Sequence, residues 1–421
     1  MRRFVWLAAI LGSACAFGQT AKNGLERKYT VIVTRHGVRS PTWTPERLNQ
    51  YSSEPWPSWG VAPGYLTPHG RELMKIMGSY YRDALWADDA GGKPDCAKAG
   101  AYFWADTDQR TLETAKAVAE GMLPGCAAEV HSAPAGTHDP LFDPTESGLA
   151  KQDPQLGLAA VTGRIGPKLD ALVEANRSAF DALVRVLNGG GKAPTSIFAQ
   201  PMTLAAGESG VAMSGPLSLA STFTENLLLE YTDGMSGDRL GWGRLNASTL
   251  LEIMTLHTAY AELMRRTPYL ARVRGSNLLS HVLRSMEQAV DGKPVKGALG
   301  KPGSSVLVIS GHDTNLSNLS GMLGLSWLLP SYQRDDVPPG GALIFSLWRS
   351  AATGRYSVRV QFVAQTMDQM HNREPLSPRN PPAIANLFVP GCSTSSEGYA
   401  CAWADFLRTA RNALSPEFTA R

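Results

Sequence analysis

Apolar positions along this chain alternate between the period of a β-strand and the period of an α-helix. Residues 29–37 read YTVIVTRHG, and this run of apolar and β-branched side chains predicts a strand. Residues 65–85 predict a helix, because Thr67 suits its N-cap and Pro68 suits its first turn. The apolar face of this helix has helical spacing and comprises Leu73, Ile76, Met77, Tyr80 and Leu85.

The order of strand, polar break and helix returns twice more. Residues 101–123 read AYFWADTDQRTLETAKAVAEGML, with the helix closing near Gly125, and residues 304–323 read SSVLVISGHDTNLSNLSGML. Residues 356–362 alternate between apolar and polar side chains, which predicts a strand with one wetter face. Strands that alternate with helices indicate an α/β fold, which we expect to be a mostly parallel sheet flanked by helices.

The middle of the chain differs from both ends. Its clear patterns are helical, and loops rich in Gly, Pro and Ser separate them. These patterns lie at residues 165–188, 218–235 and 249–286. A chain of 421 residues is long for one core. We therefore expect an α/β domain made of residues 24–140 and 301–421, interrupted by a helical insertion at residues 141–300.

The first residues are typical of a secretory signal peptide. Arg2 and Arg3 form its positive region, and a short apolar core and small residues suited to cleavage follow. We place the signal peptide at residues 1–18 and expect a periplasmic or secreted protein. Cys15 offers a lipoprotein alternative, although the residues before it form a weak lipobox.

The charge of the mature chain excludes some partners. Without Arg2 and Arg3, the 40 basic residues become 38, against 37 acidic residues, so the net charge is about +1. A nearly neutral protein has no global field that attracts nucleic acid, and no other stretch is apolar enough to cross a bilayer. We therefore expect neither nucleic acid nor a membrane as a partner, and we expect a monomer.

Cleavage also removes Cys15 and leaves four cysteines in an oxidising compartment. Four cysteines allow three pairings, and sequence neighbours favour Cys96 with Cys126 and Cys392 with Cys401. Closing the first loop stabilises the fold by about 3–4 kcal/mol on the chain-entropy model. A metal site is a weak interpretation, because no C-x-x-C pair or clustered histidine accompanies these cysteines.

Polar clusters follow three predicted strands, at residues 35–39, 106–110 and 311–313. In open α/β sheets, ligands bind beyond the carboxyl ends of the strands, so neighbouring strands would bring these clusters to one place. Three arginines, two histidines and Asp313 would then meet, with Asp106 and Asp108 beside them. Such a concentration of positive charge needs an anion, and arginine suits the oxygens of phosphate.

This combination of side chains fits phosphoryl transfer, which needs a nucleophile and a proton for the leaving oxygen. Neighbouring cations lower the pKa of a histidine, so His36, flanked by Arg35 and Arg39, is expected to stay neutral and to act as the nucleophile. Asp313 is the expected general acid. It must be protonated when it acts, which favours acidic pH or a nearby phosphate dianion that raises its pKa.

Each cluster also has an ordinary structural explanation. An isolated RHG is typical of a loop with solvated arginines, His312-Asp313 of a turn and helix cap, and Arg110 of a surface ion pair. Their shared position after predicted strands favours the functional interpretation. We interpret His69 and His257 as structural. The chain has no P-loop and no G-x-S-x-G, G-x-G-x-x-G or H-E-x-x-H motif, so we expect no nucleotide cofactor and no catalytic metal.

The motifs RHGVRSPT at residues 35–42 and GHDTN at residues 311–315 resemble those of the histidine acid phosphatases, the secreted branch of the histidine phosphatase superfamily. The resemblance extends to bacterial periplasmic phytases through ADTDQRTLETAKAVAEGMLPGC, DPLFDP, HDTNLSNLSGMLGLSWLLP, PPGGALIFSLWR and PLSPRNPPAIANLFVPGC. It covers nearly the whole mature chain, most strongly residues 29–144 and 306–401. The family implies a phosphoglycerate mutase-like α/β domain whose site is covered by a helical domain.

By this resemblance, His36 matches the nucleophile that becomes a phosphohistidine, and Asp313 matches the residue that protonates the leaving alcohol. The phosphate-binding set comprises Arg35, Arg39, Arg110 and His312. Thr42 matches a substrate contact beside the first motif, and Glu225 and Arg274 match positions that line the cleft. The pairs Cys96–Cys126 and Cys392–Cys401 match two disulfides of the phytases.

The resemblance implies a metal-independent acid phosphomonoesterase. Our first interpretation is a phytase, which acts on inositol hexakisphosphate. The alternative, from the same fold, is a glucose-1-phosphatase or a broad-specificity sugar or acid phosphatase. Trp43 stands where related phytases carry a lysine, and Thr222 replaces a larger residue, so the departures concern specificity. Trp43 has packing at the cleft rim as a second interpretation. A phosphate-ligand binding protein without turnover is a third hypothesis, although such proteins usually lose the nucleophile or the acid.

Overall fold

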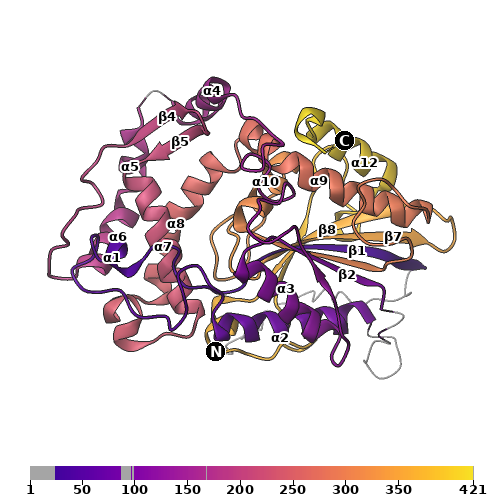
Figure 1. Cartoon of the computed structure of the whole chain (residues 1–421), viewed down its shortest axis with the longest axis horizontal. Helices are drawn as coiled ribbons and strands as arrows, with labels where there is room; N and C mark the ends of the chain where they lie inside the picture. The colour runs from indigo at the N-terminus through magenta and orange to yellow at the C-terminus, as the bar shows by residue number, and fades with distance from the viewer. Residues whose placement is uncertain (1–23, 87–95, 97–98, 167, 421) are drawn as a thin grey trace, which may run out of the picture.

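The computed structural model describes residues 24–86, 96, 99–166 and 168–420, and its centre is one β-sheet (Figure 1). The strand order is β10-β8-β7-β1-β6-β2-β3, and β9 also pairs with β8. These strands are β1 Leu25–Arg35, β2 Ala101–Ala105, β3 Val130–His131, β6 Val306–Gly311, β7 Ala342–Ser350, β8 Tyr356–Ala364, β9 Ala383–Leu387 and β10 Cys401–Ala402. The strands expected from the sequence at residues 29–37, 101–105, 304–311 and 356–362 are thus all present.

The sheet is mixed. Strands β1, β6, β2 and β3 run parallel, as expected. Strands β7, β8, β9 and β10 pair in antiparallel fashion, so the expectation of a mostly parallel sheet holds for one half of it. The reason lies in the connection between β7 and β8, which spans residues 351–355 and is too short for the crossover that parallel neighbours require.

Helices cover both faces of this sheet. The helices are α1 Pro45–Leu48, α2 Pro68–Trp86, α3 Gln109–Met122, α4 Pro154–Ile165, α5 Asp170–Ala175, α6 Arg177–Asn188, α7 Pro216–Thr232, α8 Ala247–Met264, α9 Pro268–Asp291, α10 Asp313–Leu323, α11 Met367–His371 and α12 Trp403–Ala413. Helices α2 and α3 lie on one face, and α9 and α12 lie on the other (Figure 1). Side chains of β1 alternate between the two cores: Val31 and Val33 belong to one, and Ile32 belongs to the other.

The first helix begins as its sequence predicts. Pro68 is the first residue of α2, and the hydroxyl of Thr67 accepts the backbone N–H of Gly70 at 2.9 Å. The predicted alternation at residues 356–362 is also present in β8, where Val358, Val360 and Phe362 are buried.

The middle of the chain is largely helical, with one unpredicted hairpin formed by β4 Thr203–Gly207 and β5 Gly210–Ser214. The helical pattern at residues 249–286 is two helices, because Pro268 begins α9 and cannot continue α8. Helix α9 packs against β1, α10 and α12, so it lies over the sheet although it falls inside the expected insertion. The domain boundaries themselves stay a prediction.

Two disulfides join the cysteine pairs that sequence neighbours favoured. Cys96 bonds Cys126 with a Cα–Cα distance of 5.6 Å, and Cys392 bonds Cys401 with a Cα–Cα distance of 5.3 Å. The expected signal peptide lies outside the described residues. Among the helices of the described ranges, none is both long enough and apolar enough to span a bilayer.

Helix α2 supports the turn after β1 through a close backbone contact. A Cβ on Gly70 would lie 2.1 Å from the carbonyl oxygen of Val38, two residues after His36. Gly70→Ala should therefore lower the free energy of unfolding by about 1–3 kcal/mol through overpacking. Urea denaturation of both variants measures the change. Gly163→Ala is the control, because its added Cβ meets no atom within 4 Å. That variant should be neutral or stabilised by up to about 1 kcal/mol. Equal losses in both variants would contradict the prediction.

Candidate active site

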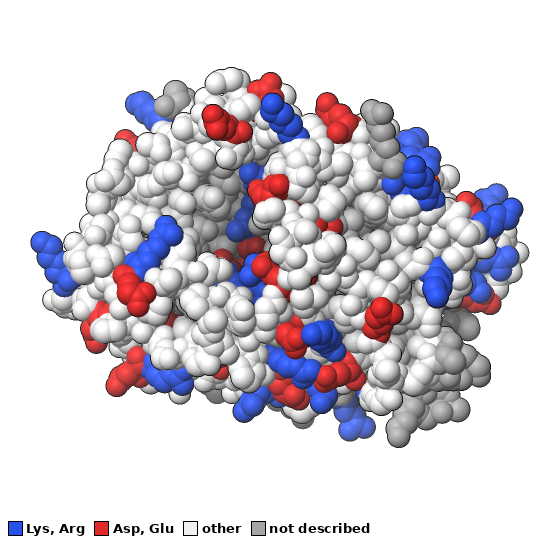
Figure 2. Space-filling model, viewed as in Figure 1, with Lys and Arg blue, Asp and Glu red and all other residues white. Residues whose placement is uncertain are grey.

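The three polar clusters of the sequence meet at the carboxyl ends of the parallel strands. Strands β1 and β2 both pair in parallel with β6, and Arg35 lies opposite Gly311 at the end of this ladder. The backbone N–H of His36 donates to the carbonyl of Gly311 at 2.8 Å, and that of Asp106 donates to Ser310 at 3.1 Å. Side chains beyond these strand ends line a cavity of about 300 Å³, among them His36, Arg39, Arg110, His312 and Asp313. In Figure 2 the molecule is hollowed between the helical part and the sheet, with basic and acidic side chains inside the hollow.

His36 is buried at the end of β1 and is poised to remain neutral. Its Nδ1 lies 2.8 Å from the carbonyl oxygen of Gly37, which can only accept, so Nδ1 carries the proton and Nε2 is left with a lone pair. Burial, followed by the charges of Arg35 and Arg110, holds the pKa of His36 well below its ordinary value. The expected direction is confirmed, and burial proves to be the largest cause.

Glu225 of α7 binds two arginines of the first cluster. The Nη2 atoms of Arg35 and Arg39 both donate to Oε1 of Glu225, with a distance of 3.0 Å for Arg39. Arg35 is 1% exposed and also donates to the carbonyl of Val337 at 2.6 Å. Burial raises the pKa of Glu225, but Arg39 and Arg35 lower it by more, so it lies below the ordinary value. Glu225 therefore supplies the anion that holds Arg35 and Arg39 beside His36.

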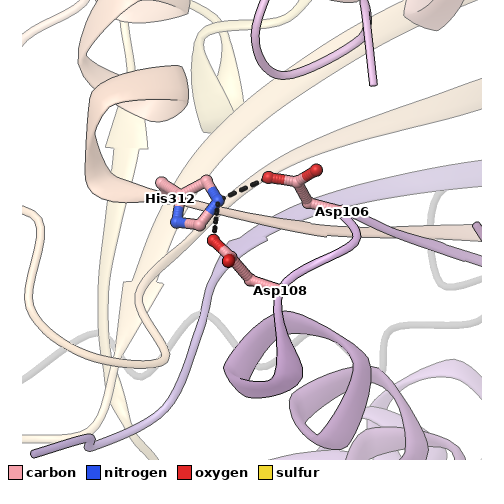
Figure 3. Close-up of side chains that lie close together, drawn as sticks. All are labelled: Asp106, Asp108 and His312. Atoms are coloured by element: carbon pink, nitrogen blue, oxygen red, sulfur yellow. Dashed lines mark hydrogen bonds and ion pairs between the residues drawn. The ribbon is translucent and has the colours of Figure 1, made fainter. Parts of the chain in front are cut away.

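The second and third clusters are joined through His312 (Figure 3). Its Nε2 lies 2.6 Å from Oδ2 of the buried Asp106 and 3.6 Å from Oδ2 of Asp108. Asp108 also pairs with Arg110 at 2.6 Å, and Arg110 Nη2 lies 3.5 Å from Nδ1 of His312. Because a carboxylate only accepts, Asp106 fixes a proton on Nε2 and leaves Nδ1 beside Arg110.

Asp313 occupies the first turn of α10, where its carboxylate faces two side chains of the helical part. Arg265 at the end of α8 donates from Nη1 to Oδ2 of Asp313, and His257 Nε2 lies 3.8 Å from the same oxygen. Burial raises the pKa of Asp313, but Arg265, Arg35 and His257 lower it by more, to well below its ordinary value. Asp313 is thus ionised in the free protein. The structural interpretation of His257 and His69 stays a prediction: His257 is buried and its Nδ1 also contacts Ser221 at 3.1 Å, and His69 contacts the carbonyl of Met370 at 2.8 Å.

The remaining expected residues lie around the rim. Thr42 is exposed, and a Cβ on Gly64 would lie 3.5 Å from its methyl group and 3.6 Å from Nη1 of Arg110. Thr42 is therefore near the cluster. Arg274 is half-buried and donates to the carbonyl of Met264 at 3.3 Å, directly beside Arg265.

Trp43 has clear packing partners. Its ring centroid lies 5.9 Å from that of Phe223, and the guanidinium of Arg47 stacks 3.5 Å from its ring centroid. Trp43 also lines a separate cavity of about 510 Å³ together with Trp56 and Trp59. Thr222, on the neighbouring helix α7, directs its hydroxyl to the carbonyl of Ser218 at 3.2 Å.

The residue that sequence reasoning missed is Arg265. It follows the last residue of α8 and precedes another arginine, and no spacing in the sequence connects it with Asp313, 48 residues away. Asp106 was part of a recognised cluster, but its role as the partner of His312 follows from the structure alone.

Two groups of side chains place three possible metal-ligand atoms within 4.8 Å of one another. They are Asp106, Asp108 and His312, and Glu225, His257 and Asp313. Their carboxylates are already paired with His312, Arg110, Arg35, Arg39 or Arg265. A metal ion would therefore have to displace a guanidinium or an imidazole from either group.

Comparisons with known proteins agree with this geometry. A family model for the histidine phosphatase superfamily (branch 2) matches residues 28–156 and 203–363. Phytase AppA of Escherichia coli (strain K12) is 36% identical over 428 residues, which is 98% of each chain. A glucose-1-phosphatase of Providencia rettgeri is 26% identical over 398 residues, covering 91% of each chain.

A solved structure of Hafnia alvei phytase in complex with myo-inositol hexakis sulphate has the same fold. Its TM-score is 0.85 at 33% identity, over 95% of this chain and 100% of that chain. The likeness covers both the sheet and the helical part.

The contact between Asp106 and His312 predicts a role for Asp106 in anion binding. Asp106→Asn keeps the shape of the side chain but removes the carboxylate that fixes the proton on Nε2 of His312 and orients its ring. The affinity for inorganic phosphate, measured by calorimetry at mildly acidic pH, should fall about ten- to hundred-fold. Asp139→Asn is a control, because Asp139 contacts Trp104 Nε1 and backbone groups instead of His312. Unchanged affinity in Asp106→Asn would contradict the assignment.

Proposed function

The chain belongs to branch 2 of the histidine phosphatase superfamily and is a phosphoric monoester hydrolase; we propose that it is an exported phytase that works through a phosphohistidine at His36. The observation that carries the proposal is the buried imidazole of His36, oriented through Nδ1 and surrounded by Arg35, Arg39 and Arg110. Phytase AppA and the Hafnia alvei phytase support the substrate class through their similarity over nearly the whole chain.

The first step transfers the phosphoryl group to the protein. Nε2 of His36 attacks phosphorus, the bond between phosphorus and the alcohol oxygen breaks, and that oxygen takes a proton from Asp313. Arg35, Arg39, Arg110 and His312 stabilise the charge on the three remaining phosphoryl oxygens. Glu225 accepts from Nη2 of Arg35 and of Arg39 in the free protein, whereas Nε of each arginine has no hydrogen-bond partner among the described residues and can donate to a phosphoryl oxygen.

The second step releases phosphate. Water attacks phosphorus, the bond to Nε2 breaks, and Asp313, now ionised, accepts the proton of the water. The pKa of Asp313 is depressed, so its protonated form is present only in acid. Turnover of esters whose alcohol needs a proton should therefore decline as the pH rises, as expected of an acid phosphatase.

Exported location is part of the same proposal. The disulfides Cys96–Cys126 and Cys392–Cys401 support it, because disulfides persist in oxidising compartments. The expected signal peptide at residues 1–18 would provide the route.

Glucose-1-phosphatase activity is the second candidate, and Trp43 is the observation that favours it. Trp43 puts an aromatic ring where a cation would serve a substrate with several phosphates, and the Providencia rettgeri relative supports this alternative. We rank phytase first, because of the higher identity to Phytase AppA.

Replacement of His36 tests the mechanism. His36→Ala should abolish hydrolysis of 4-nitrophenyl phosphate and phytate, because no other group replaces the attacking Nε2. Rapid quenching of the parent protein with ³²P-labelled substrate should trap an alkali-stable phosphoryl label that the variant lacks. His131→Ala, which alters a partly exposed histidine of the edge strand β3, should keep near-parental turnover. Substantial hydrolysis by folded His36→Ala would exclude the mechanism.

Replacement of Trp43 tests the substrate. The parent protein should have a higher kcat/KM for phytate than for glucose-1-phosphate. Trp43→Lys should raise that ratio about ten-fold, because an ammonium at the rim can bind a further phosphate. Trp43→Met, which also removes the ring but adds no charge, should leave the ratio near the parental value. Negligible phytate turnover by both the parent and Trp43→Lys would leave glucose-1-phosphatase as the better proposal.

A further inference from the structure

Arg265 contacts the group that must deliver a proton. It follows α8, its backbone N–H donates to the carbonyl of Ala261 at 2.9 Å, and its Nη1 donates to Oδ2 of Asp313. The side chain of Arg265 is 14% exposed and that of Asp313 is 12% exposed. A guanidinium–carboxylate pair so shielded from water interacts more strongly than an exposed pair does.

Charged groups from several elements surround Asp313. Arg35 and Arg39 approach from the end of β1, Glu225 from α7, His257 and Arg265 from α8 and its end, and Asp336 from the loop before β7. Arg35 and Arg39 are already bonded to Glu225, and His257 Nε2 is 3.8 Å away. Arg265 is therefore the cation bonded directly to the carboxylate of Asp313.

We propose that Arg265 is a positioning residue that holds the Asp313 carboxylate ionised and thereby sets how acidic the solution must be before Asp313 can protonate a departing alcohol. This inference rests on the proposed phosphomonoesterase reaction. When Asp313 gives its proton to the alcohol oxygen, the carboxylate that results returns to the ion pair with Arg265. The same pair keeps Asp313 ionised for the second step, in which it accepts a proton from water.

The proposal distinguishes substrates by their leaving groups. Glycerol 2-phosphate releases an alkoxide unless a proton arrives, whereas 4-nitrophenyl phosphate releases a stable phenolate without help. The value of kcat/KM reports the steps up to the first release, so it isolates proton donation from the hydrolysis of the phosphohistidine.

Arg265→Gln is the test. Loss of the guanidinium raises the pKa of Asp313 in the variant, so the decline of kcat/KM on glycerol 2-phosphate should move to higher pH. At neutral pH the ratio of kcat/KM for glycerol 2-phosphate over 4-nitrophenyl phosphate should rise about ten-fold. Arg265→Lys retains a cation and should restore the parental pH profile. Arg272→Gln, which removes an exposed arginine of α9, controls for the loss of one positive charge and should change neither quantity.

Several results would overturn the proposal. If kcat/KM falls equally on both substrates with an unchanged pH profile, Arg265 binds substrate or supports the fold instead. If Arg272→Gln gives the same shift, the effect is one of general charge. If the parent protein hydrolyses neither ester, the proposed function fails. The effect of Arg265 on Asp313 is then tested by a measurement that needs no turnover. Infrared titration, with the signal assigned by its loss in Asp313→Asn, should show the carboxyl of Asp313 taking up its proton at higher pH in Arg265→Gln than in the parent. Equal titration would refute the ion-pair effect.

Discussion

The contact of Glu225 with Arg35 and Arg39 is the interaction on which the site depends. Two guanidinium groups flank a buried imidazole at the end of β1, and in a medium of low dielectric constant such cations repel one another strongly. One carboxylate oxygen accepts from both. Burial, followed by the charges of neighbouring arginines, lowers the pKa of His36, and Glu225 offsets the repulsion between Arg35 and Arg39 at the strand end.

The same principle extends across the site and explains why the helical part is needed. Arg110 pairs with Asp108, His312 with Asp106, and Asp313 with Arg265. The strand ends supply most of the cations proposed to bind phosphate, whereas α7 supplies Glu225 and the end of α8 supplies Arg265 as counter-charges. The helical part therefore does more than cover the cavity, because its charges fix the protonation of groups on the sheet.

Much of this arrangement was predictable, for reasons that are local. A parallel ladder places successive strand ends at one edge, so the clusters after β1, β2 and β6 could be brought together from their sequence positions alone. The N-cap at Thr67 and the alternation in β8 were equally local. The hairpin β4–β5 and the antiparallel half of the sheet were not predicted, because the pairing partner of a strand depends on its connections and register. The contacts of Arg265 and His257 with Asp313 could not be predicted. They depend on how α8 packs against α10, which the periodicity of the sequence does not encode.

The ion pairs of Asp313 and Glu225 have opposite effects on the stability of the fold and on the reactivity of the site. Asp313 and Glu225 have pKa values below their ordinary ones, so each stabilises the fold above its unfolded pKa, and the stabilisation is lost as the pH falls through the folded value. Protonation of Asp313, which the proposed first step requires, also weakens the ion pair with Arg265. A bound phosphate dianion reduces this conflict, because its charge offsets Arg35 and Arg39 and raises the pKa of Asp313. In the proposed reaction, the substrate's own charge thus helps convert Asp313 from a counter-ion into a proton donor.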